Sequence, residues 1–448
     1  MRRAFSNTPL RGAPLQRQDA RDMAVRVLQR LEGAVAPVQT VLNQVLSRAA
    51  CEPADAALCS ELCYGALRME IRLRWLLARF LKAPKKLPPR MRCILLVAMY
   101  ALVFLEGMPV YAVVDWAVEN VKRTHGQTLS RVANGCLRAV CREGADPRDY
   151  AYYHAAAPDE QARQALYHSL PLWIVRLWHD GYGPDKAALL MAKSSARPAA
   201  GLRVNRLRPN WEDLAKQLET SGARRFAPAC FSVMPELRAQ MEDQCFLASL
   251  LAEGRLSRQG AASQLALHVL RPEIWPDPLW DACAGQGTKS CALLELGKDV
   301  RMAGDTHLQR LRRIHAECLR LRLPTPLVVQ ASALYPPLAF TPGTIVVDAP
   351  CSGLGVLAAR PDIRRHRKAD DVQPLIRLQA AMLETAYAEL AVGGHIAYIA
   401  CTQNPAENEE QIRAFLRRHP AAVLAQEWNS PVENALLEGM YAALLVKR

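Results

Sequence analysis

The sequence predicts an all-α bundle in its N-terminal third, followed by an α/β domain whose sheet is Rossmann-like and mostly parallel. Three observations predict this fold. Apolar residues recur at helical spacing up to about residue 147, strand and helix patterns alternate beyond about residue 226, and 448 residues are too many for one ordinary hydrophobic core. We therefore expect a basic tail at 1–18, a helical domain at 19–147, a connecting α/β subdomain at 148–225 and a Rossmann-like domain at 226–448.

Composition and charge bound the class of protein. Half of the residues are hydrophobic and 22% are charged, which is typical of a folded, soluble chain. Lys and Arg number 57 against 43 Asp and Glu, and the resulting charge of +14 favours a polyanionic partner such as RNA. The longest apolar run, at 94–105, is about half of the length that a bilayer requires, so we expect no membrane span.

Cysteine usage indicates the compartment. The 13 cysteines have no repeated spacing, and the first residues lack the apolar segment of a secretory signal. We therefore expect reduced thiols in a cytoplasmic protein. Because no cluster of Cys and His has the spacing of a zinc finger, we expect no structural metal.

Apolar periodicity predicts the N-terminal helices. The first begins after Asp19, a candidate N-cap, and repeats apolar residues at i, i+3, i+4 and i+7. Further amphipathic stretches lie at 38–46, about 54–81, 91–105, 110–123 and 127–141. Several basic residues lie between Arg68 and Arg92, and they form either a solvated face or a surface that contacts RNA.

The rest of the chain alternates strands and helices. In the connecting subdomain, 202–205 is a candidate strand that leads into a helix at about 211–220. The strand candidates beyond it are 265–269, 279–282, 300–304, 326–330, 344–348 and 395–400. Helices are expected to begin near Thr288, Leu308, Asp371 and Asn408. This alternation is typical of a doubly wound parallel sheet.

A glycine turn predicts half of a ligand site. The strand that ends at Asp281 runs into the turn 283–290 and then a helix, so the backbone can approach a ligand at the helix N-terminus. The next strand ends at Asp305, where a carboxylate can accept hydrogen bonds from ribose hydroxyls. The pattern fits a nucleoside-containing cofactor. Asp305 is also a candidate N-cap for the helix that follows it.

Two thiols lie just beyond predicted strand ends. Cys351 follows the strand that ends at Asp348, and Cys401 follows the strand 395–400. Open α/β sheets bind ligands at this edge, although either cysteine can equally be a small buried hydrophobe. A thiolate that adds to C6 of cytosine makes C5 nucleophilic toward an electrophilic methyl group. An acid must then protonate or hydrogen-bond N3, and Asp348 occupies a suitable position.

Longer motifs extend this interpretation to a family. The segments 64–68, 109–114 and 132–138 resemble the NusB-type helical RNA-binding domain. The segment Asp348-Ala-Pro-Cys-Ser-Gly-Leu-Gly355 and the segment Tyr398-Ile-Ala-Cys-Thr402, followed by Glu407, are similar to motifs of the Sun/RsmB-type RNA 5-methylcytosine methyltransferases, relatives of the NSUN family. The resemblance covers nearly the whole chain.

The resemblance implies a set of roles. Cys401 is the nucleophile that attacks C6, Cys351 assists breakdown of the adduct, and Asp348 belongs to the catalytic group. The cofactor is S-adenosylmethionine, and the positions that match its contacts are Cys283, Ala284, Gly285, Gln286, Gly287, Thr288, Lys289, Asp305, Ser332 and Asp348. By the same resemblance, the substrate is small-subunit ribosomal RNA. We expect the protein to be a monomer.

The chain departs from the family pattern in the cofactor half, where Gly285 is an additional glycine. Gln286 replaces a proline, Thr288 replaces a glycine, and Ser332 stands where an aspartate commonly contacts the adenine amino group. Because both thiols remain, we expect an active enzyme. Two alternatives stay open: the same chemistry on transfer RNA, and a noncatalytic RNA-binding or assembly factor that retains the fold.

Overall fold

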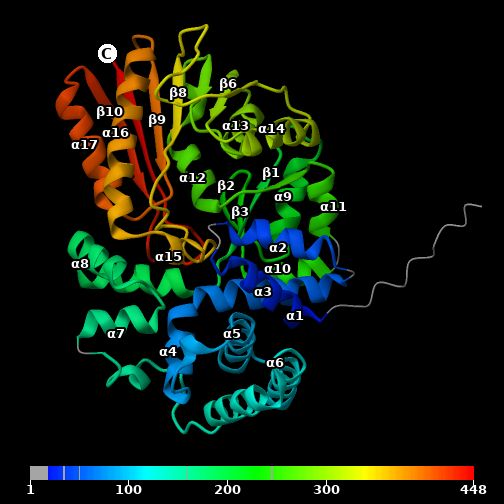
Figure 1. The fold of residues 1–448 in the computed structure, drawn as a ribbon. Coiled ribbons are helices and arrows are strands. Elements are labelled where there is room, and N and C mark those ends of the chain that lie inside the picture. The colour runs from blue at the N-terminus through cyan, green and yellow to red at the C-terminus, as the bar shows by residue number, and fades with distance from the viewer. Residues whose placement is uncertain (1–18, 34–35, 50, 158, 244–245) are drawn as a thin grey trace, which may run out of the picture. The chain divides into compact units, whose positions relative to one another are not determined.

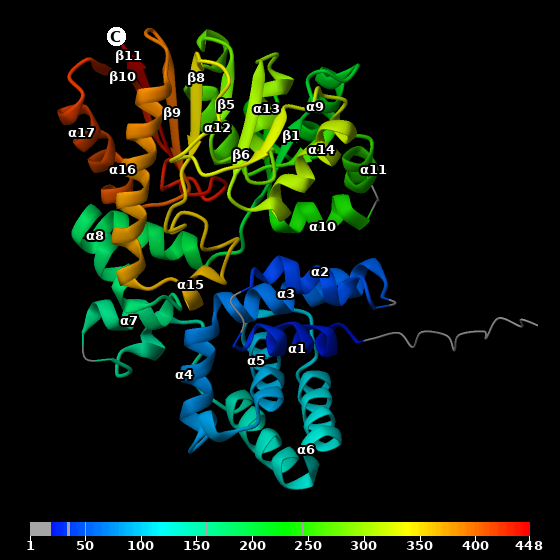
Figure 2. The same ribbon diagram turned by 45° about the horizontal axis from the view of Figure 1, so that its top comes forward.

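The protein divides into two compact units, residues 1–157 and 158–448, in a computed structural model (Figures 1 and 2). The structure describes residues 19–33, 36–49, 51–157, 159–243 and 246–448. The predicted basic tail at 1–18 lies outside the described residues.

The first unit is built from helices. Its elements are α1 (Ala20–Leu31), α2 (Val38–Leu46), α3 (Pro53–Arg68), α4 (Glu70–Phe80), η1 (Pro84–Lys86), α5 (Pro89–Phe104), α6 (Val110–Cys141) and η2 (Tyr150–Tyr153). The predicted N-cap is confirmed, because the Asp19 carboxylate accepts a hydrogen bond from the Arg21 backbone N–H at 2.7 Å. The two predicted stretches at 110–123 and 127–141 join within α6 at Gly126, where φ is 83° and the helix breaks.

The core of this unit surrounds α5. Residues 93–101 of this helix are buried, and α1, α3, α4 and α6 pack against it. The apolar run at 94–105 therefore lies in the hydrophobic core of a helical bundle. In the part of the chain that the structure describes, no helix is long and apolar enough to cross a membrane.

The basic residues between Arg68 and Arg92 do not share one surface. Arg68 and Arg72 are buried, and the Arg72 guanidinium donates to the Tyr153 hydroxyl at 2.7 Å and to the Pro147 carbonyl at 2.5 Å. Arg92 pairs with Glu32 at 3.2 Å. The prediction that these basic residues form a solvated face or contact RNA is therefore wrong for Arg68 and Arg72.

The second unit contains two sheets and the helices that cover them. Its elements are α7 (Glu160–Tyr167), α8 (Leu172–Ser195), β1 (Ala200–Val204), α9 (Trp211–Thr220), β2 (Arg224–Ala227), β3 (Cys230–Val233), α10 (Pro235–Asp243), α11 (Phe246–Ala252), β4 (Leu256–Arg258), α12 (Ala261–Val269), η3 (Pro272–Ile274), β5 (Leu279–Asp281), α13 (Thr288–Glu295), β6 (Val300–Asp305), α14 (Leu308–Leu321), β7 (Leu327–Gln330), β8 (Thr344–Asp348), α15 (Ile363–His366), η4 (Ala369–Asp371), α16 (Val372–Glu389), β9 (His395–Ala400), η5 (Pro405–Glu407), α17 (Glu409–Arg418), β10 (Ala422–Asn429) and β11 (Tyr441–Lys447).

The smaller sheet has the strand order β2-β3-β1-β4 and is antiparallel at each pairing. Its strand β1 and the helix α9 lie where the sequence predicts them. The expected boundary between residues 225 and 226 falls within β2, so this sheet draws strands from both sides of it.

The larger sheet has the order β10-β11-β9-β8-β5-β6-β7 and is mostly parallel, as predicted. The strands β9, β8, β5, β6 and β7 pair in parallel, whereas β11 pairs with both β9 and β10 in antiparallel fashion. The predicted strand at 265–269 is wrong, because these residues end the helix α12. Its buried side chains, including Ala262 and Ala266, recur at helical spacing, and alanine favours a helix.

Alternate residues of the central strands face different layers. Val346 and Ala397 pack with α12, α13 and α14, whereas Ile345 and Ile396 pack with α16 and α17 on the other face. This period of two is that of a strand buried on both faces. The sheet is therefore doubly wound, and its carboxyl edge gathers the ends of β5, β6, β8 and β9.

Candidate active site

The two predicted thiols meet at the carboxyl edge of the sheet. The neighbouring parallel strands β8 and β9 bring Asp348 opposite Ile399, and the Ala349 N–H donates to the Ile399 carbonyl at 2.8 Å. The chain beyond each strand then turns so that Cys351 Sγ lies 3.2 Å from Cys401 Sγ. Both residues are half-buried. The prediction that a pair of thiols shares one site agrees with this geometry.

The two thiols differ in acidity. The pKa of Cys401 lies below its usual 9.0, chiefly because of the hydrogen bond between its sulfur and that of Cys351, and Lys289 adds a favourable positive charge. Burial and the nearby Asp348 oppose this effect. The pKa of Cys351 is raised well above 9.0 by the same hydrogen bond and by burial. Cys401 is therefore the sulfur that more readily becomes a thiolate, the nucleophilic form.

Lys289 connects the thiol pair with the cofactor turn. Its ammonium group donates to Asp348 Oδ2 at 2.6 Å from the first turn of α13. This pairing with Asp348 keeps the pKa of Lys289 above its usual 10.5 even though burial acts in the opposite direction. Asp348 keeps about a third of its side chain exposed, so its carboxylate faces the open side of the site.

The predicted cofactor turn is held largely by backbone atoms. Gly285 and Gly287 have φ of 57° and 81°, a region that favours glycine, and the Gly285 N–H donates to Asp305 Oδ2 at 3.1 Å. The Gly287 N–H closes the turn onto the Ala284 carbonyl. Asp305 also accepts from the His307 N–H at 2.7 Å, but His307 is the N-cap of α14, so the prediction that Asp305 caps this helix is wrong.

The remaining predicted cofactor positions lie around this turn. Ser332 follows β7, and the Ala331 N–H beside it donates to the Asp305 carbonyl at 3.2 Å. Gln286 accepts a hydrogen bond from Arg313 at 2.9 Å, and Cys283 is half-buried, with a pKa that burial raises. The structure therefore brings the turn, Asp305 and Ser332 together. A positive-φ turn, a carboxylate at the next strand end and the N-terminus of α13 are suitable for a nucleoside with a charged tail.

A support beneath this turn has no signal in the sequence. Arg203 of β1 pairs with Glu295 of α13, with both side chains almost fully buried, and also donates to the Thr288 carbonyl at 3.1 Å. The smaller sheet thus fixes the first turn of α13. No local motif marks Arg203, because its partners lie far away in the sequence.

A second missed group lies at the end of β5. Asp281 is buried and accepts a hydrogen bond from the Ser290 hydroxyl at 2.5 Å. Burial raises its pKa to about 6. A signal was available, since Ser290 is the last residue of the predicted turn and Asp281 the last residue of the strand before it.

A third missed group lies beneath the thiols. The carboxylate of Glu407 is buried and contacts the loops of both Cys351 and Cys401 through Ser352 and Thr402. Glu407 follows the second thiol closely in the sequence. Its position relative to Cys401 did not indicate which residues the carboxylate would contact.

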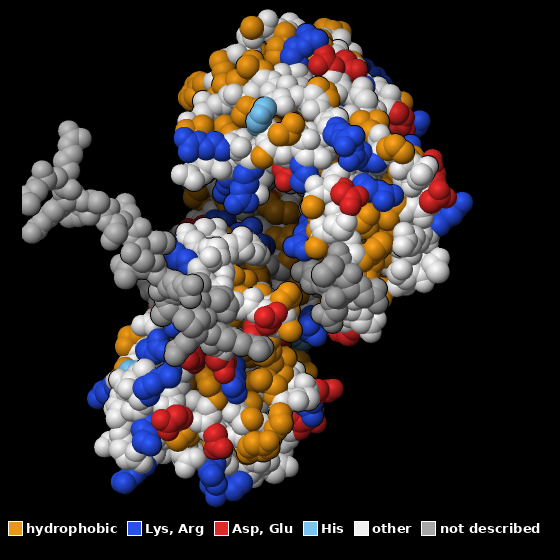
Figure 3. All heavy atoms as spheres, turned by 90° about the vertical axis from the view of Figure 1, so that its right-hand side faces the viewer, with side chains coloured by type: hydrophobic (Ala, Val, Ile, Leu, Met, Phe, Trp, Pro, Cys, Tyr) orange, Lys and Arg blue, Asp and Glu red, His pale blue; other side chains and the backbone are white. Residues whose placement is uncertain are grey.

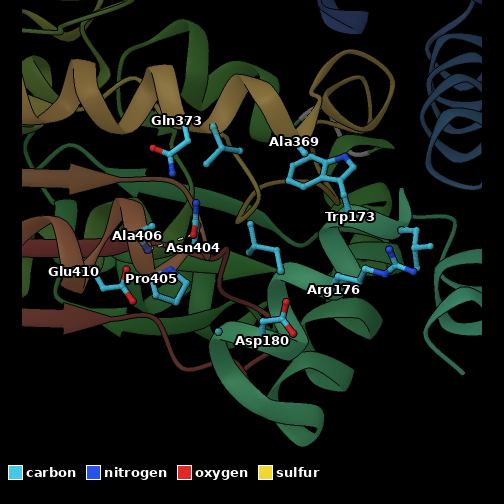
Figure 4. A pocket seen from close by; sticks show the side chains of 13 residues that line it. Trp173, Arg176, Asp180, Ala369, Gln373, Asn404, Pro405, Ala406 and Glu410 are labelled. Carbon is cyan, nitrogen blue, oxygen red and sulfur yellow. Dashed lines mark hydrogen bonds between the residues drawn. The ribbon is translucent and has the colours of Figure 1, made fainter.

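A pocket of about 620 Å³ adjoins the loop after Cys401. Figure 4 shows Trp173, Arg176 and Asp180 of α8 on one side, and Pro405 and Glu410 on the other. The Trp178 indole N–H fixes α8 to this loop by donating to the Gln403 carbonyl at 2.9 Å. Because its rim carries side chains of both signs, the pocket does not by itself indicate a polyanion.

One face of the molecule shows how basic side chains are distributed. On the face drawn in Figure 3, Lys and Arg lie among acidic and hydrophobic side chains. The charge of +14 is therefore not gathered into a single patch on that face.

Comparison with known proteins adds independent findings. A family model described as 16S rRNA methyltransferase RsmB/F matches residues 268–445, and a NusB family model matches residues 18–142. The ribosomal RNA small subunit methyltransferase B of Vibrio cholerae is 32% identical over 414 residues, which cover 88% of this chain and 90% of that protein. A Bacillus subtilis protein named probable ribosomal RNA small subunit methyltransferase B is 29% identical, covering 91% of this chain and 90% of its own.

The fold also has a solved counterpart. The crystal structure of PH0851 superposes with a TM-score of 0.74 and 20% identity, and the match covers 96% of this chain and 99% of that one. At this level of identity the likeness concerns the fold alone.

Proposed function

Because this chain belongs to the RsmB/F family of 16S rRNA methyltransferases and carries a NusB domain, we propose that it methylates C5 of a cytosine in small-subunit ribosomal RNA. Cys401 is the proposed nucleophile, and S-adenosylmethionine is the proposed methyl donor. The observation that carries the proposal is the pair of unlike thiols, 3.2 Å apart, beside the Lys289–Asp348 ion pair.

The residues around the glycine turn fit the proposed cofactor. Asp305 would accept hydrogen bonds from the ribose hydroxyls, and the backbone N–H groups at the start of α13 would face the carboxylate of the methionine part. Ser332, on the adjacent loop, would lie on the adenine side. When bound, S-adenosylmethionine supplies the methyl group.

The thiol pair accounts for both halves of a covalent cycle. The Cys401 thiolate adds to C6 of the cytosine, which makes C5 nucleophilic, and the methyl group then bonds to C5. After the C5 proton has left to a base, the bond between Cys401 and C6 breaks. With Cys401 as the thiolate, Cys351 would donate its S–H to that sulfur and stabilise it as the leaving group in this last step.

We propose that Asp348 lies next to N3 of the bound cytosine. Lys289 donates to Oδ2 of this carboxylate, and a third of the Asp348 side chain is exposed. Lys289 keeps its proton, and its ammonium group has N–H groups besides the one that Asp348 accepts, so the ion pair can offer a hydrogen-bond donor to N3 as the adduct forms. The target base would have to leave its stack to expose C6, which favours a single-stranded or loop cytosine.

The decisive experiment is methyl transfer to RNA that lacks its modifications. Purified protein is incubated with methyl-labelled S-adenosylmethionine and either 16S ribosomal RNA or transfer RNA, and the digested nucleosides are separated. We expect label in 5-methylcytidine from 16S RNA. Label from transfer RNA alone would contradict the substrate, and label in another nucleoside would contradict the reaction.

A further inference from the structure

We propose that Glu407 is a positioning residue that holds the loops of the two thiols in register beneath the active site. It lies in η5, after the Cys401 loop, and its carboxylate is fully buried. It does not touch either sulfur. Its role in the reaction rests on the proposed function, whereas its effect on the spacing of the thiols does not.

The carboxylate bridges the two loops directly. Toward the Cys351 loop, Glu407 Oε1 accepts from the Ser352 N–H at 2.8 Å, and Oε2 accepts from the Ser352 hydroxyl. Toward the Cys401 loop, Oε2 accepts from the Asn404 amide at 2.9 Å and from the Thr402 hydroxyl at 3.4 Å. Ser352 and Thr402 each follow a thiol by one residue, so one side chain fixes both neighbours.

Two more contacts tie this bridge to the scaffold. Gln379 of α16 donates from one amide nitrogen to Glu407 Oε1 and to the Pro350 carbonyl, both at 3.0 Å. The Tyr398 hydroxyl of β9 donates to the Glu407 carbonyl at 2.8 Å. The two loops are therefore joined to each other, to a helix and to the central sheet by hydrogen bonds that are shielded from water, where each bond matters more than at the surface.

A carboxylate is the side chain that these donors require. The Ser352 N–H can only donate to Oε1, and the Gln379 nitrogen is kept toward Oε1 by its second bond to the Pro350 carbonyl. The Asn404 nitrogen is kept toward Oε2 because the oxygen of that amide accepts from the Ala406 N–H. In Glu407→Gln, the new NH₂ group would face a donor in either orientation. An unsatisfied buried group costs about 1–3 kcal/mol, which the two loops can relieve by moving apart.

The test measures the distance between the thiols separately from activity. In the absence of RNA, diamide oxidises two adjacent thiols to a disulfide and is itself reduced to the hydrazine, and mass spectrometry follows the peptide that links Cys351 with Cys401. We expect Glu407→Gln to slow this cross-link and to lower kcat for methyl transfer, each by about tenfold, while the KM for S-adenosylmethionine stays within about twofold. Glu389→Gln, the same change at an exposed residue of α16, should leave both rates unchanged.

Ser352→Ala provides a second variant if Glu407→Gln does not fold. It removes one hydroxyl donor but keeps the backbone bond, so we expect a smaller slowing of the cross-link with little change in Tm. A native cross-linking rate in Glu407→Gln would overturn the proposal, whatever happens to activity. A slower cross-link in a protein that shows no methyl transfer even as wild type would support the positioning role and reject only the proposed reaction.

Discussion

The cofactor half and the thiol half of the site are held in different ways. The cofactor turn depends on backbone: positive φ at Gly285 and Gly287, and N–H groups that donate to a carboxylate and a carbonyl. The thiol half depends on side chains, since Cys351 contacts Cys401, and the Glu407 carboxylate accepts from the Ser352 hydroxyl and the Asn404 amide in the loops that carry them. A backbone turn tolerates changes of side chain that a side-chain network does not. This difference explains how Gln286 and Thr288 can depart from the family pattern while both thiols remain.

The sharpest test of the comparison is removal of either thiol. We expect Cys401→Ala to reduce methyl transfer to background, because the sulfur proposed to add to C6 is lost. Cys351→Ala should instead accumulate a covalent complex between protein and RNA, since the leaving thiolate loses its hydrogen-bond donor. Denaturing gel electrophoresis with labelled RNA measures this complex. If Cys401→Ala accumulates it instead, the two roles are reversed.

A backbone change should affect the cofactor half next most strongly. In Gly287→Ala, a left-handed φ costs about 1–2 kcal/mol, and the new Cβ would lie 2.9 Å from Ile314 Cγ1. We expect affinity for S-adenosylmethionine to fall by about tenfold, as measured by calorimetry.

Gly297→Ala is the matched control for this change. Gly297 lies at the other end of α13 with φ of 79°, and a Cβ added there would meet no atom within 4 Å. It should lower stability by a similar backbone strain yet leave cofactor affinity unchanged. Equal losses of affinity in the two variants would show that helix stability, and not the shape of the turn, governs binding.

Lys289 links the two halves, and its removal should shift the pH dependence of the thiol half. The pKa of Cys401 is lowered first by Cys351 and then by Lys289, so Lys289→Met removes a positive charge and raises that pKa. Because only the thiolate reacts with iodoacetamide, half-maximal alkylation of Cys401 should move to higher pH.

The control for this shift is Lys298→Met. Lys298 also pairs with an aspartate, Asp277, at 3.1 Å, but it lies beyond the other end of α13. The alkylation curve of Cys401 should stay in place in this variant. A curve that also stays in place in Lys289→Met would mean that Lys289 does not act on the thiol.

The smallest effect is expected from restoring a family side chain in the cofactor half. Ser332→Asp would add an acceptor for the adenine amino group, and one hydrogen bond predicts a gain in S-adenosylmethionine affinity of about threefold to tenfold. Ser332→Ala should change affinity little. A large loss of S-adenosylmethionine affinity in Ser332→Ala would contradict this comparison, because it would show that the cofactor half also depends on a side chain.

The parts of the molecule that follow from local pattern could be predicted from the sequence. The helix cap at Asp19, the strands ending at Asp281, Asp305 and Asp348, and the helix beginning at Thr288 each have a signal within a few residues. Since parallel strands end at one edge, the meeting of the two thiols could be anticipated as well.

What could not be predicted depends on distant partners. Arg203 and Glu295 are far apart in the sequence, and the donors to Glu407 come from three separate segments. The error at 265–269 had a different cause, because an alternating run of leucine and alanine also fits one buried face of a helix. The predicted strands end at residue 400, so the antiparallel strands β10 and β11 were not predicted.

The position of β11 bears on how the chain is synthesised. Strand β9 is paired with β8 on one side, and its other edge is covered by β11, which the ribosome makes only after α17 and β10. Until Tyr441–Lys447 emerges, the largely apolar β9 presents an open edge that can pair with another chain. A nascent chain that stalls before this segment is therefore expected to aggregate, even though Cys351 and Cys401 have already been synthesised.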